Sequence, residues 1–445
     1  MDHYLVRFSH SHETFRLPEL QALATLEGLD LEVVKYNPES PFCVIRVAND
    51  AAAGAALVRR SLIVQSVHSL WGMADTLPDL HADVAQRAAS LWPPFIASSF
   101  KMEIDSFQGR RTAAARLSII DSFGKTLPLE GPIDLHEPDC LLTVFERWVH
   151  DAMQKQLTEP EEYYLGRYIA RSSRDAIRTF DLKKRRYIAT TSMDAELSLL
   201  TANLALAAPG KLFYDPFVGT GSFPLAAAYW GAVTWGSDID GRAVRGSAAG
   251  INGAGGLGGS REGRNDVRGN FEQYGLLSGF GDLLIADLTN TPLRRSGGSS
   301  RWIDGIVCDP PYGVREGPRV LGCRNPTKTP WVVETGRLRY REPTFLVPKQ
   351  PYGFMALLHD LLQFSADTLV DNGRLSFWMP TANDEVQELP VPTHPCLAVV
   401  SVYAELGTDV LATTSASVES SKSIGLTANQ LNPFRRGYFN TKPEE

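Results

Sequence analysis

The chain has 445 residues, more than one compact core usually holds, so two or three domains are expected. Its 43% hydrophobic and 21% charged residues are ordinary for a globular protein, no stretch approaches the ~18 apolar residues of a membrane-spanning helix, and the net charge of −7 argues against a uniformly basic, nucleic-acid-binding surface. Five cysteines without a C-x-x-C pair and an N-terminus without a signal-peptide pattern argue against a disulfide framework and a built-in zinc site, and predict a cytoplasmic protein.

The first 70 residues predict a small α+β unit. Residues 4–8 alternate in polarity like a strand, and residues 43–47 form a second, apolar strand. Residues 17–26 carry apolar side chains at helical spacing, and the Ala-rich stretch 51–58 predicts another helix. This order of strand and helix is typical of a ferredoxin-like unit, which we assign to residues 1–70.

A second α+β unit is predicted for residues 71–165. Its pattern indicates a helix over 80–91 and strands over 99–105, 113–121 and 140–145.

Residues 166–189 are polar and basic, and we interpret them as a linker. The earlier pairs Arg59-Arg60 and Arg110-Arg111 are interpreted as solvated surface charge. The candidate RNA-binding residues are four consecutive basic residues, Lys183, Lys184, Arg185 and Arg186.

From about residue 190 to 445, helices alternate with strands that are almost wholly apolar, which favours a parallel sheet covered by helices on both faces. The Gly-rich stretch 250–269 and the polar stretch 314–350 are predicted loops. The predicted helices are 195–207, 222–229 and 353–369, and the predicted strands are 211–214, 233–237, 283–286, 303–308 and 374–379.

A glycine turn follows the first of these strands. Glycines let the backbone approach a ligand closely, and the helix that begins near Ser222 would point its N-terminus at that ligand. A dinucleotide site would have G-x-G-x-x-G here, but Pro224 stands at the third glycine position, which favours a cofactor without a pyrophosphate. The alternative is an ordinary tight turn between strand and helix. The candidate cofactor-binding residues of this turn are Asp215, Pro216, Phe217, Gly219 and Gly221.

Acidic residues end the next two strands. Asp238 closes one of them and can accept hydrogen bonds from both hydroxyls of a ribose, whereas Asp240 either joins it or caps the following helix. Asp287 ends the next strand and can accept a hydrogen bond from an adenine amine. A single Asp at a strand end is usually a turn residue, but three in successive units after a glycine turn favour a cofactor site.

The tetrapeptide Asp309-Pro310-Pro311-Tyr312 follows the apolar strand 303–308. The Asp309 carboxylate and the Pro310 carbonyl can each accept one N–H of a planar amine and so make its nitrogen nucleophilic. The two prolines fix the backbone that holds this carbonyl, and Tyr312 offers a face on which a base can stack. The alternative is a Pro-Pro turn at a strand end.

Residues 215–221, Asp238 and residues 309–312 resemble the motifs of class I S-adenosylmethionine-dependent amino-methyltransferases. A closer resemblance, extending to about residue 380, is to the catalytic subunits of eukaryotic tRNA guanosine-N2 methyltransferases that act at position ten. The runs that carry it are 184–188, 191–198, 214–223, 309–317 and, in the N-terminal half, 133–139.

This resemblance implies a Rossmann-like class I methyltransferase domain over 190–445, preceded by a ferredoxin-like unit and a THUMP domain that binds RNA. It implies S-adenosylmethionine as cofactor, tRNA as substrate, Asp309 as amine acceptor and Tyr312 as the stacking ring. Thr191, Ser192 and Met193 would lie against the methionine end of the cofactor. From spacing alone, Thr191 also predicts a helix cap paired with Asp194.

The resemblance further implies a heterodimer with a small zinc-binding activator subunit, which would cover an apolar edge of the methyltransferase sheet. After about residue 410 the chain turns to Ser, Thr and small residues where the family continues with paired strands. The end of the sheet is therefore expected to be atypical.

Two other functions fit the same motifs. The tetrapeptide alone does not exclude an enzyme that methylates adenine N6 or cytosine N4 in DNA or other RNA, but the N-terminal α+β half and the run 309–317 favour tRNA. A non-catalytic RNA-binding protein on a methyltransferase fold is the third hypothesis, and Asp215, Asp238 and Asp309 argue against it.

Overall fold

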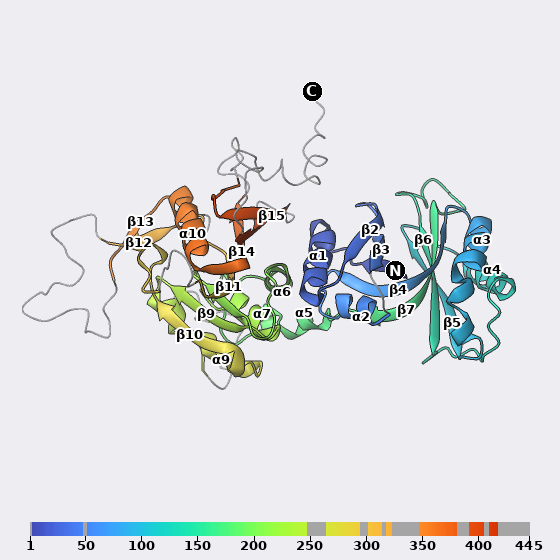
Figure 1. Cartoon of the computed structure of the whole chain (residues 1–445), viewed down its shortest axis with the longest axis horizontal. Helices are drawn as coiled ribbons and strands as arrows, with labels where there is room; N and C mark the ends of the chain where they lie inside the picture. The colour runs from blue at the N-terminus through green and yellow to red at the C-terminus, as the bar shows by residue number, and fades with distance from the viewer. Residues whose placement is uncertain are drawn as a thin grey trace, which may run out of the picture. The chain divides into compact units, whose positions relative to one another are not determined.

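The computed structural model describes residues 2–47, 51–246, 264–293, 301–313, 317–322, 347–380, 391–404 and 409–416. The chain divides into two compact units, Met1–Arg174 and Asp175–Glu445 (Figure 1). Within the described residues, no helix combines the length and the apolarity that crossing a membrane requires.

The first unit is built on one seven-stranded sheet in the order β2-β3-β1-β4-β7-β6-β5. Neighbouring strands are antiparallel except for β5 and β6, which are parallel. The strands are β1 (Asp2–Phe8), β2 (Leu31–Tyr36), β3 (Phe42–Val47), β4 (Val64–Ala74), β5 (Phe100–Phe107), β6 (Cys140–Arg147) and β7 (Glu162–Arg171). The helices are α1 (Arg16–Glu27), α2 (Ala51–Val58), α3 (Leu77–Arg87) and α4 (Ala113–Ser122).

Helices α3 and α4 lie together beside β5 and β6 (Figure 1). Leu80 and Val84 of α3 and Ile119 of α4 are buried against Trp71 of β4 in one apolar cluster. Because Leu80 and Val84 are four residues apart, they lie on one helix face, which is why this sequence buries α3 on the sheet.

The predicted helices and strands of this unit are confirmed with one exception. Residues 113–121 form helix α4 and not a strand, because the Thr112 hydroxyl accepts a hydrogen bond from Ala115 N and caps the helix, and the alanines that follow favour it. Three strands, β2, β4 and β7, were not predicted.

The single sheet also changes the predicted boundaries. Strand β4 crosses the predicted boundary at residue 70, so the two predicted N-terminal parts share one sheet. Strand β7 extends to Arg171, so residues 166–171 belong to this sheet and not to a linker.

The second unit contains a seven-stranded sheet in the order β10-β9-β8-β11-β14-β16-β15, parallel except for the antiparallel pairs β14/β16 and β15/β16. The strands are β8 (Leu212–Asp215), β9 (Val233–Asp238), β10 (Phe280–Ile285), β11 (Ile303–Cys308), β14 (Leu369–Pro380), β15 (Leu397–Ala404) and β16 (Asp409–Ala416). The helices are α5 (Asp175–Thr179), α6 (Ala195–Leu204), α7 (Ser222–Tyr229), α8 (Gly241–Val244), α9 (Val267–Gln273) and α10 (Phe354–Thr368). A separate ribbon pairs β12 (Arg319–Leu321) with β13 (Lys349–Pro351).

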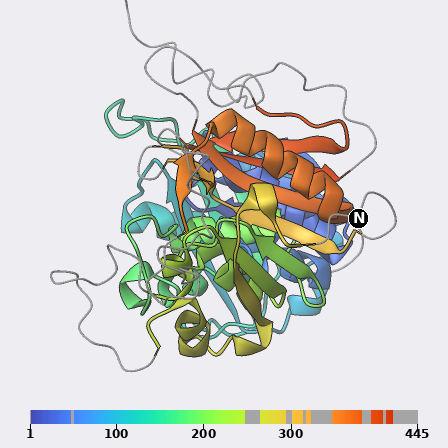
Figure 2. The ribbon, with the colours of Figure 1, turned by 90° about the vertical axis from the view of Figure 1, so that its left-hand side faces the viewer.

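This strand order has a switch point. The chain proceeds from β8 outward to β9 and β10, then returns to place β11 on the other side of β8. In such sheets the crevice for a ligand opens at the carboxyl ends of the two strands at the switch point. Helix α10 lies along β14 and buries Leu357, Leu361 and neighbouring apolar residues (Figure 2).

The predicted α/β class and the parallel sheet are confirmed. The expectation of an atypical end to the sheet is wrong up to residue 416, because β15 and β16 pair with each other and complete it. Residues 267–269 of the predicted Gly-rich loop belong to α9, and the predicted loop 314–350 contains β12 and the first residues of β13. The rest of both predicted loops, except residues 264–266, 317–318, 322 and 347–348, and the tail after residue 416 lie outside the described residues.

Candidate active site

A cavity of about 290 Å³ opens at the carboxyl ends of β8, β9 and β11. Most of the residues predicted for catalysis and cofactor binding line it, although they come from segments far apart in the sequence. Those residues are Thr191, Ser192, Met193, Pro216, Phe217, Gly219, Asp238, Asp240, Asp287, Asp309, Pro310, Pro311 and Tyr312.

The glycine turn forms one wall of this cavity, which Gly219 and Thr220 line. Gly219 and Gly221 have φ values of 47° and 81°, a left-handed backbone that glycine adopts without strain. A Cβ on Gly221 would lie 2.5 Å from Cγ1 of Val267, so no larger residue fits there. A Cβ on Gly219 would meet only Phe217 O, at 3.9 Å, so this side of the turn is open and a ligand can approach the backbone.

Asp238 ties the glycine turn to the end of β9. One carboxylate oxygen accepts a hydrogen bond from Gly219 N at 2.9 Å, and the other accepts one from Asp240 N at 2.7 Å. Asp238 therefore orders the cavity wall in which its own carboxylate lies.

Asp240 caps the short helix α8, which was the alternative prediction for it. Its side chain accepts a hydrogen bond from Arg242 N at 3.0 Å and pairs with the Arg242 guanidinium at 2.6 Å. The hydrogen bond from Arg242 lowers the pKa of Asp240 to about 2, so this carboxylate is charged at neutral pH.

Asp287 accepts more hydrogen bonds from within the protein than the sequence predicted. It is 4% exposed, and one of its oxygens accepts hydrogen bonds from the backbone N and the hydroxyl of Thr289, both at 2.9 Å. Its other oxygen accepts a hydrogen bond from Leu321 N at 2.7 Å. Asp287 thus attaches the ribbon of β12 and β13 to the rim of the cavity, where Arg319 and Lys349 also lie.

The tetrapeptide 309–312 follows directly on β11, the sheet neighbour of the glycine turn's own strand β8, and lines the cavity. The Tyr312 ring lies edge-on to Phe354, with 6.5 Å between ring centroids. Gly313 has a φ of 107°, a backbone conformation that favours glycine. Residues 314–316 of the family-like continuation lie outside the described residues.

Asp215 does not line the cavity but lies behind it. The residue is 1% exposed, and its Oδ1 accepts a hydrogen bond from Phe217 N at 2.9 Å. Its Oδ2 is buried and has no hydrogen-bond partner among the described residues. Burial, together with the negative charges of Asp238 and Asp309, raises the pKa of Asp215 well above its usual value. The neutral acid is therefore more strongly favoured at this position than at an exposed aspartate.

The segment 191–193 contacts the glycine turn and the start of helix α7. The hydroxyls of Ser192 and Thr220 are 2.7 Å apart, and the Ser222 hydroxyl donates to Met193 O at 3.2 Å. The predicted cap at Thr191 is wrong. Asp194 caps α6 by accepting hydrogen bonds from the two backbone N–H groups that follow Ala195. The helix begins at Ala195, as predicted, so Thr191 lies three residues too early to be its cap.

The four basic residues predicted to bind RNA do not form one surface. Arg185 is 3% exposed and donates a hydrogen bond to the Ser222 hydroxyl at 2.7 Å, so it is an interior residue and the prediction is wrong for it. Lys183 and Lys184 are exposed, and Arg186 is half-buried with its backbone N bound to Gln273.

The structure adds cavity residues that sequence reasoning missed. Ile239, Ala286 and Leu288 stand next to the predicted acids, so the same strand-end pattern could have identified them. Arg319 and Lys349 gave no such signal, because only the pairing of β12 with β13 brings them to the rim.

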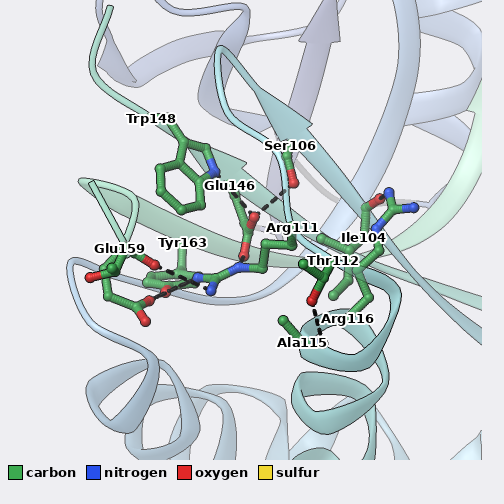
Figure 3. A network of polar contacts seen from close by, with 11 residues as sticks. Ile104, Ser106, Arg111, Thr112, Ala115, Arg116, Glu146, Trp148, Glu159 and Tyr163 are labelled. Atoms are coloured by element: carbon green, nitrogen blue, oxygen red, sulfur yellow. Dashed lines mark hydrogen bonds and ion pairs between the residues drawn. The ribbon is translucent and has the colours of Figure 1, made fainter. Parts of the chain in front are cut away.

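The first unit has a hollow of its own, beside the N-terminus of α4. Arg111, interpreted from sequence as a surface charge, has a side chain only 9% exposed and forms an ion pair with the fully buried Glu146 at 2.5 Å. Figure 3 shows Glu159, Tyr163 and Trp148 around the same guanidinium, whose carbon lies 5.1 Å from the Trp148 ring centroid. The hollow is lined by Ile104, Asp105, Ser106, Gly109, Arg110, Arg111, Ala113, Arg116, Leu117 and Ile120.

Comparison with known proteins gives consistent results over both units. A family profile described as the Tmrp11 THUMP N-terminal domain matches residues 2–174. The Saccharomyces cerevisiae protein named tRNA (guanine(10)-N(2))-methyltransferase is 38% identical over 401 residues, which cover 88% of each chain. The Schizosaccharomyces pombe protein of the same name is 34% identical, covering 90% of this chain and 86% of its own. The human protein named tRNA (guanine(10)-N(2))-methyltransferase TRMT11 is 32% identical, covering 90% and 84%.

Proposed function

Since this chain belongs to the tRNA (guanine(10)-N(2))-methyltransferase family, we propose that it transfers a methyl group from S-adenosylmethionine to N2 of the guanosine at position ten of tRNA. The observation that carries this proposal is the cavity at the switch point, in which the glycine turn, the strand-end acids and the tetrapeptide 309–312 meet.

The residues present fit the cofactor. The open side of Gly219 allows close approach of a ligand to the backbone, and Asp238 stands at the end of β9, where a carboxylate suits ribose hydroxyls. Thr191, Ser192 and Met193 would contact its methionine part. S-adenosylmethionine supplies an activated methyl group, so the chain's own task is mainly orientation.

Asp309 and Pro310 orient the substrate amine. The Asp309 carboxylate accepts one N–H of guanine N2 and the Pro310 carbonyl accepts the other, which turns the nitrogen lone pair out of conjugation with the ring. Pro310 and Pro311 hold this carbonyl in place, and Tyr312 stacks on the base after it has left its own stack.

We propose that the tRNA also binds the first unit, at the hollow beside α4. Arg110 is exposed there, and the hollow combines arginines with the apolar side chains of Leu117 and Ile120. Guanidinium groups suit phosphates and apolar faces suit unstacked bases, so this hollow has the chemistry of a single-stranded RNA site. Lys183 and Lys184 remain candidate contacts in the second unit.

The proposed heterodimer partner is a small zinc-binding activator in the cytoplasm. The described residues contain no cluster of side chains that could hold a metal ion. Within the described part of the chain, β10 is an edge strand of the second sheet, and Ile285 at its end is 50% exposed. An apolar sheet edge is a surface that a partner strand can extend, and we place the activator there.

The proposed function is tested by mass-spectrometric mapping of nucleosides in tRNA from cells with and without this gene product. Loss of N2-methylguanosine at position ten, restored by the wild-type chain but not by Asp309→Ala, is the expected result. Restoration by Asp309→Ala, or methylation of DNA alone by the purified complex, would contradict the proposal.

A further inference from the structure

Side chains of helix α9 bind the backbone of residues 184–187, the segment that leads to cavity residues 191–193. Gln273 accepts a hydrogen bond from Arg186 N at 2.9 Å and donates one to Lys184 O at 2.7 Å. Asn270, three residues earlier and therefore on the same helix face, binds both backbone groups of Tyr187. The helix thus holds residues 184–187 as a neighbouring strand would.

Asn270 also reaches the glycine turn. Its Oδ1 accepts from Tyr187 N at 2.9 Å, and its Nδ2 donates to Tyr187 O at 2.9 Å and to Thr220 O at 3.3 Å. The side chain is 1% exposed, so all three of these hydrogen bonds form in the interior. An amide is the side chain that can do this, because it offers one acceptor and two donors in one plane.

Helix α9 also packs against the glycine turn. Val267 occupies the space that a Cβ on Gly221 would need, so α9 determines the shape of the turn by packing as well as by hydrogen bonding. Beyond Tyr187 the segment continues to Ser192, whose hydroxyl lies 2.7 Å from that of Thr220. Two walls of the cavity, residues 191–193 and residues 219–221, are therefore joined through Asn270.

We propose that Asn270 is a positioning residue for the methyl-donor site, which holds the segment 184–193 at a constant distance from the glycine turn. Asn270 does not line the cavity and touches no reacting atom, so it acts through Thr220 and the segment that carries Ser192 and Met193. This inference rests on the proposed function, since it takes the cavity to be the S-adenosylmethionine site.

The test measures binding of S-adenosylhomocysteine to the full-length chain by titration calorimetry, in wild type, Asn270→Ala and Asn270→Asp. Asn270→Asp keeps the acceptor and the volume but replaces both donors by charge that faces two carbonyls. We expect both variants to bind at least about tenfold more weakly, the loss that one or two buried hydrogen bonds correspond to. KM for S-adenosylmethionine should rise similarly, with kcat at saturation and KM for tRNA changed less than about twofold.

Thr234→Val is the matched control. Thr234 is 1% exposed and its hydroxyl donates to Gly279 O at 3.0 Å, but it lies on β9 away from the cavity. This variant removes a buried hydrogen bond from the same unit and should leave the affinity for S-adenosylhomocysteine unchanged. An equal loss in Thr234→Val and the Asn270 variants would overturn the inference, as would unchanged affinity in folded Asn270→Asp.

Hydrogen exchange on the wild-type chain gives a reading that needs no variant. S-adenosylhomocysteine should slow exchange of the Tyr187 amide, which does not line the cavity but is bound to Asn270. Unchanged exchange at Tyr187, with protection at residues 219–221, would overturn this inference but leave the proposed function standing. A wild-type chain that binds no S-adenosylhomocysteine, either alone or together with the activator subunit, would overturn the proposed function as well.

Discussion

At the scale of single residues, the site gives two carboxyl groups at neighbouring strand ends different surroundings. Asp215 is the last residue of β8 and Asp309 follows directly after β11, and each stands at the start of a motif. In the structure Asp309 lies in the cavity wall, whereas Asp215 lies behind it with a raised pKa. Asp309 is in place to accept a hydrogen bond from the substrate, whereas burial makes ionisation of Asp215 less favourable than at an exposed aspartate.

Asp309→Asn should therefore lower the rate of methyl transfer without loss of cofactor binding. The amide accepts a hydrogen bond less strongly than a carboxylate, so we expect the single-turnover rate to fall roughly 10²–10³-fold. Affinity for S-adenosylhomocysteine should stay within about threefold of wild type. A variant that keeps its rate would show that the amine acceptor is another group.

Asp215→Asn should change how stability depends on pH. Because the folded pKa of Asp215 lies above its usual value of 3.8, the folded state binds the proton more tightly than the unfolded state. In the wild type this residue's contribution is full below the unfolded pKa and is lost as pH rises towards the folded pKa. The amide in the variant cannot ionise, so its urea unfolding should show a smaller decline in stability above about pH 4. Parallel pH profiles of the two chains would contradict this expectation.

At the scale of elements, the helices decide which backbone forms the site. α7 begins where the glycine turn ends, and α9 packs its Val267 against Gly221. Most elements of this unit were predictable, because apolar strands and amphipathic helices follow local patterns. α9 was not, since it is short and follows a Gly-rich stretch that masks its start.

Gly221→Ala should destabilise the chain more than Gly210→Ala. Both glycines have φ near 80°, so each substitution costs about 1–2 kcal/mol for a left-handed backbone. Only Gly221 has a neighbour, Val267 Cγ1, within 2.5 Å of the added Cβ, whereas Gly210 has none within 4 Å. Urea unfolding should give a difference of at least about 1 kcal/mol between the two variants. Equal losses of stability in the two variants would mean that α9 moves aside at no cost in free energy.

Ile285→Lys tests the proposed partner edge. A charge at the end of β10 should prevent copurification with the activator, because lysine on an edge strand opposes pairing with another chain. Met355→Lys is the control, since Met355 is 45% exposed on α10, away from that edge. Copurification that survives Ile285→Lys would place the activator elsewhere.

At the scale of the whole molecule, an acidic chain must hold an acidic substrate. The net charge of −7 favours weak, salt-dependent binding through local clusters rather than a general attraction. The first unit supplies such a cluster at the hollow beside α4, where buried Glu146 fixes Arg111 and Arg110 remains exposed.

Arg110→Glu should weaken tRNA binding about threefold to tenfold and reduce the slope of log affinity against log salt by about one. The control is Arg59→Glu, because Arg59 is 71% exposed in the same unit but does not line the hollow. Filter binding across a salt series measures both quantities. Equal effects of the two variants would show that the hollow has no special role.

The sequence by itself determined the class of the second unit, the glycine turn and the order of the strand-end acids, because these depend on patterns within a few residues. It also indicated Asp309 to Tyr312, which line the cavity. Only the tertiary structure decided that Arg185 is interior, that Asp287 binds Leu321 N, that Asp215 lies behind the cavity and that Asn270 joins two of its walls. Each of these depends on contacts between segments far apart in the chain, which no local periodicity encodes.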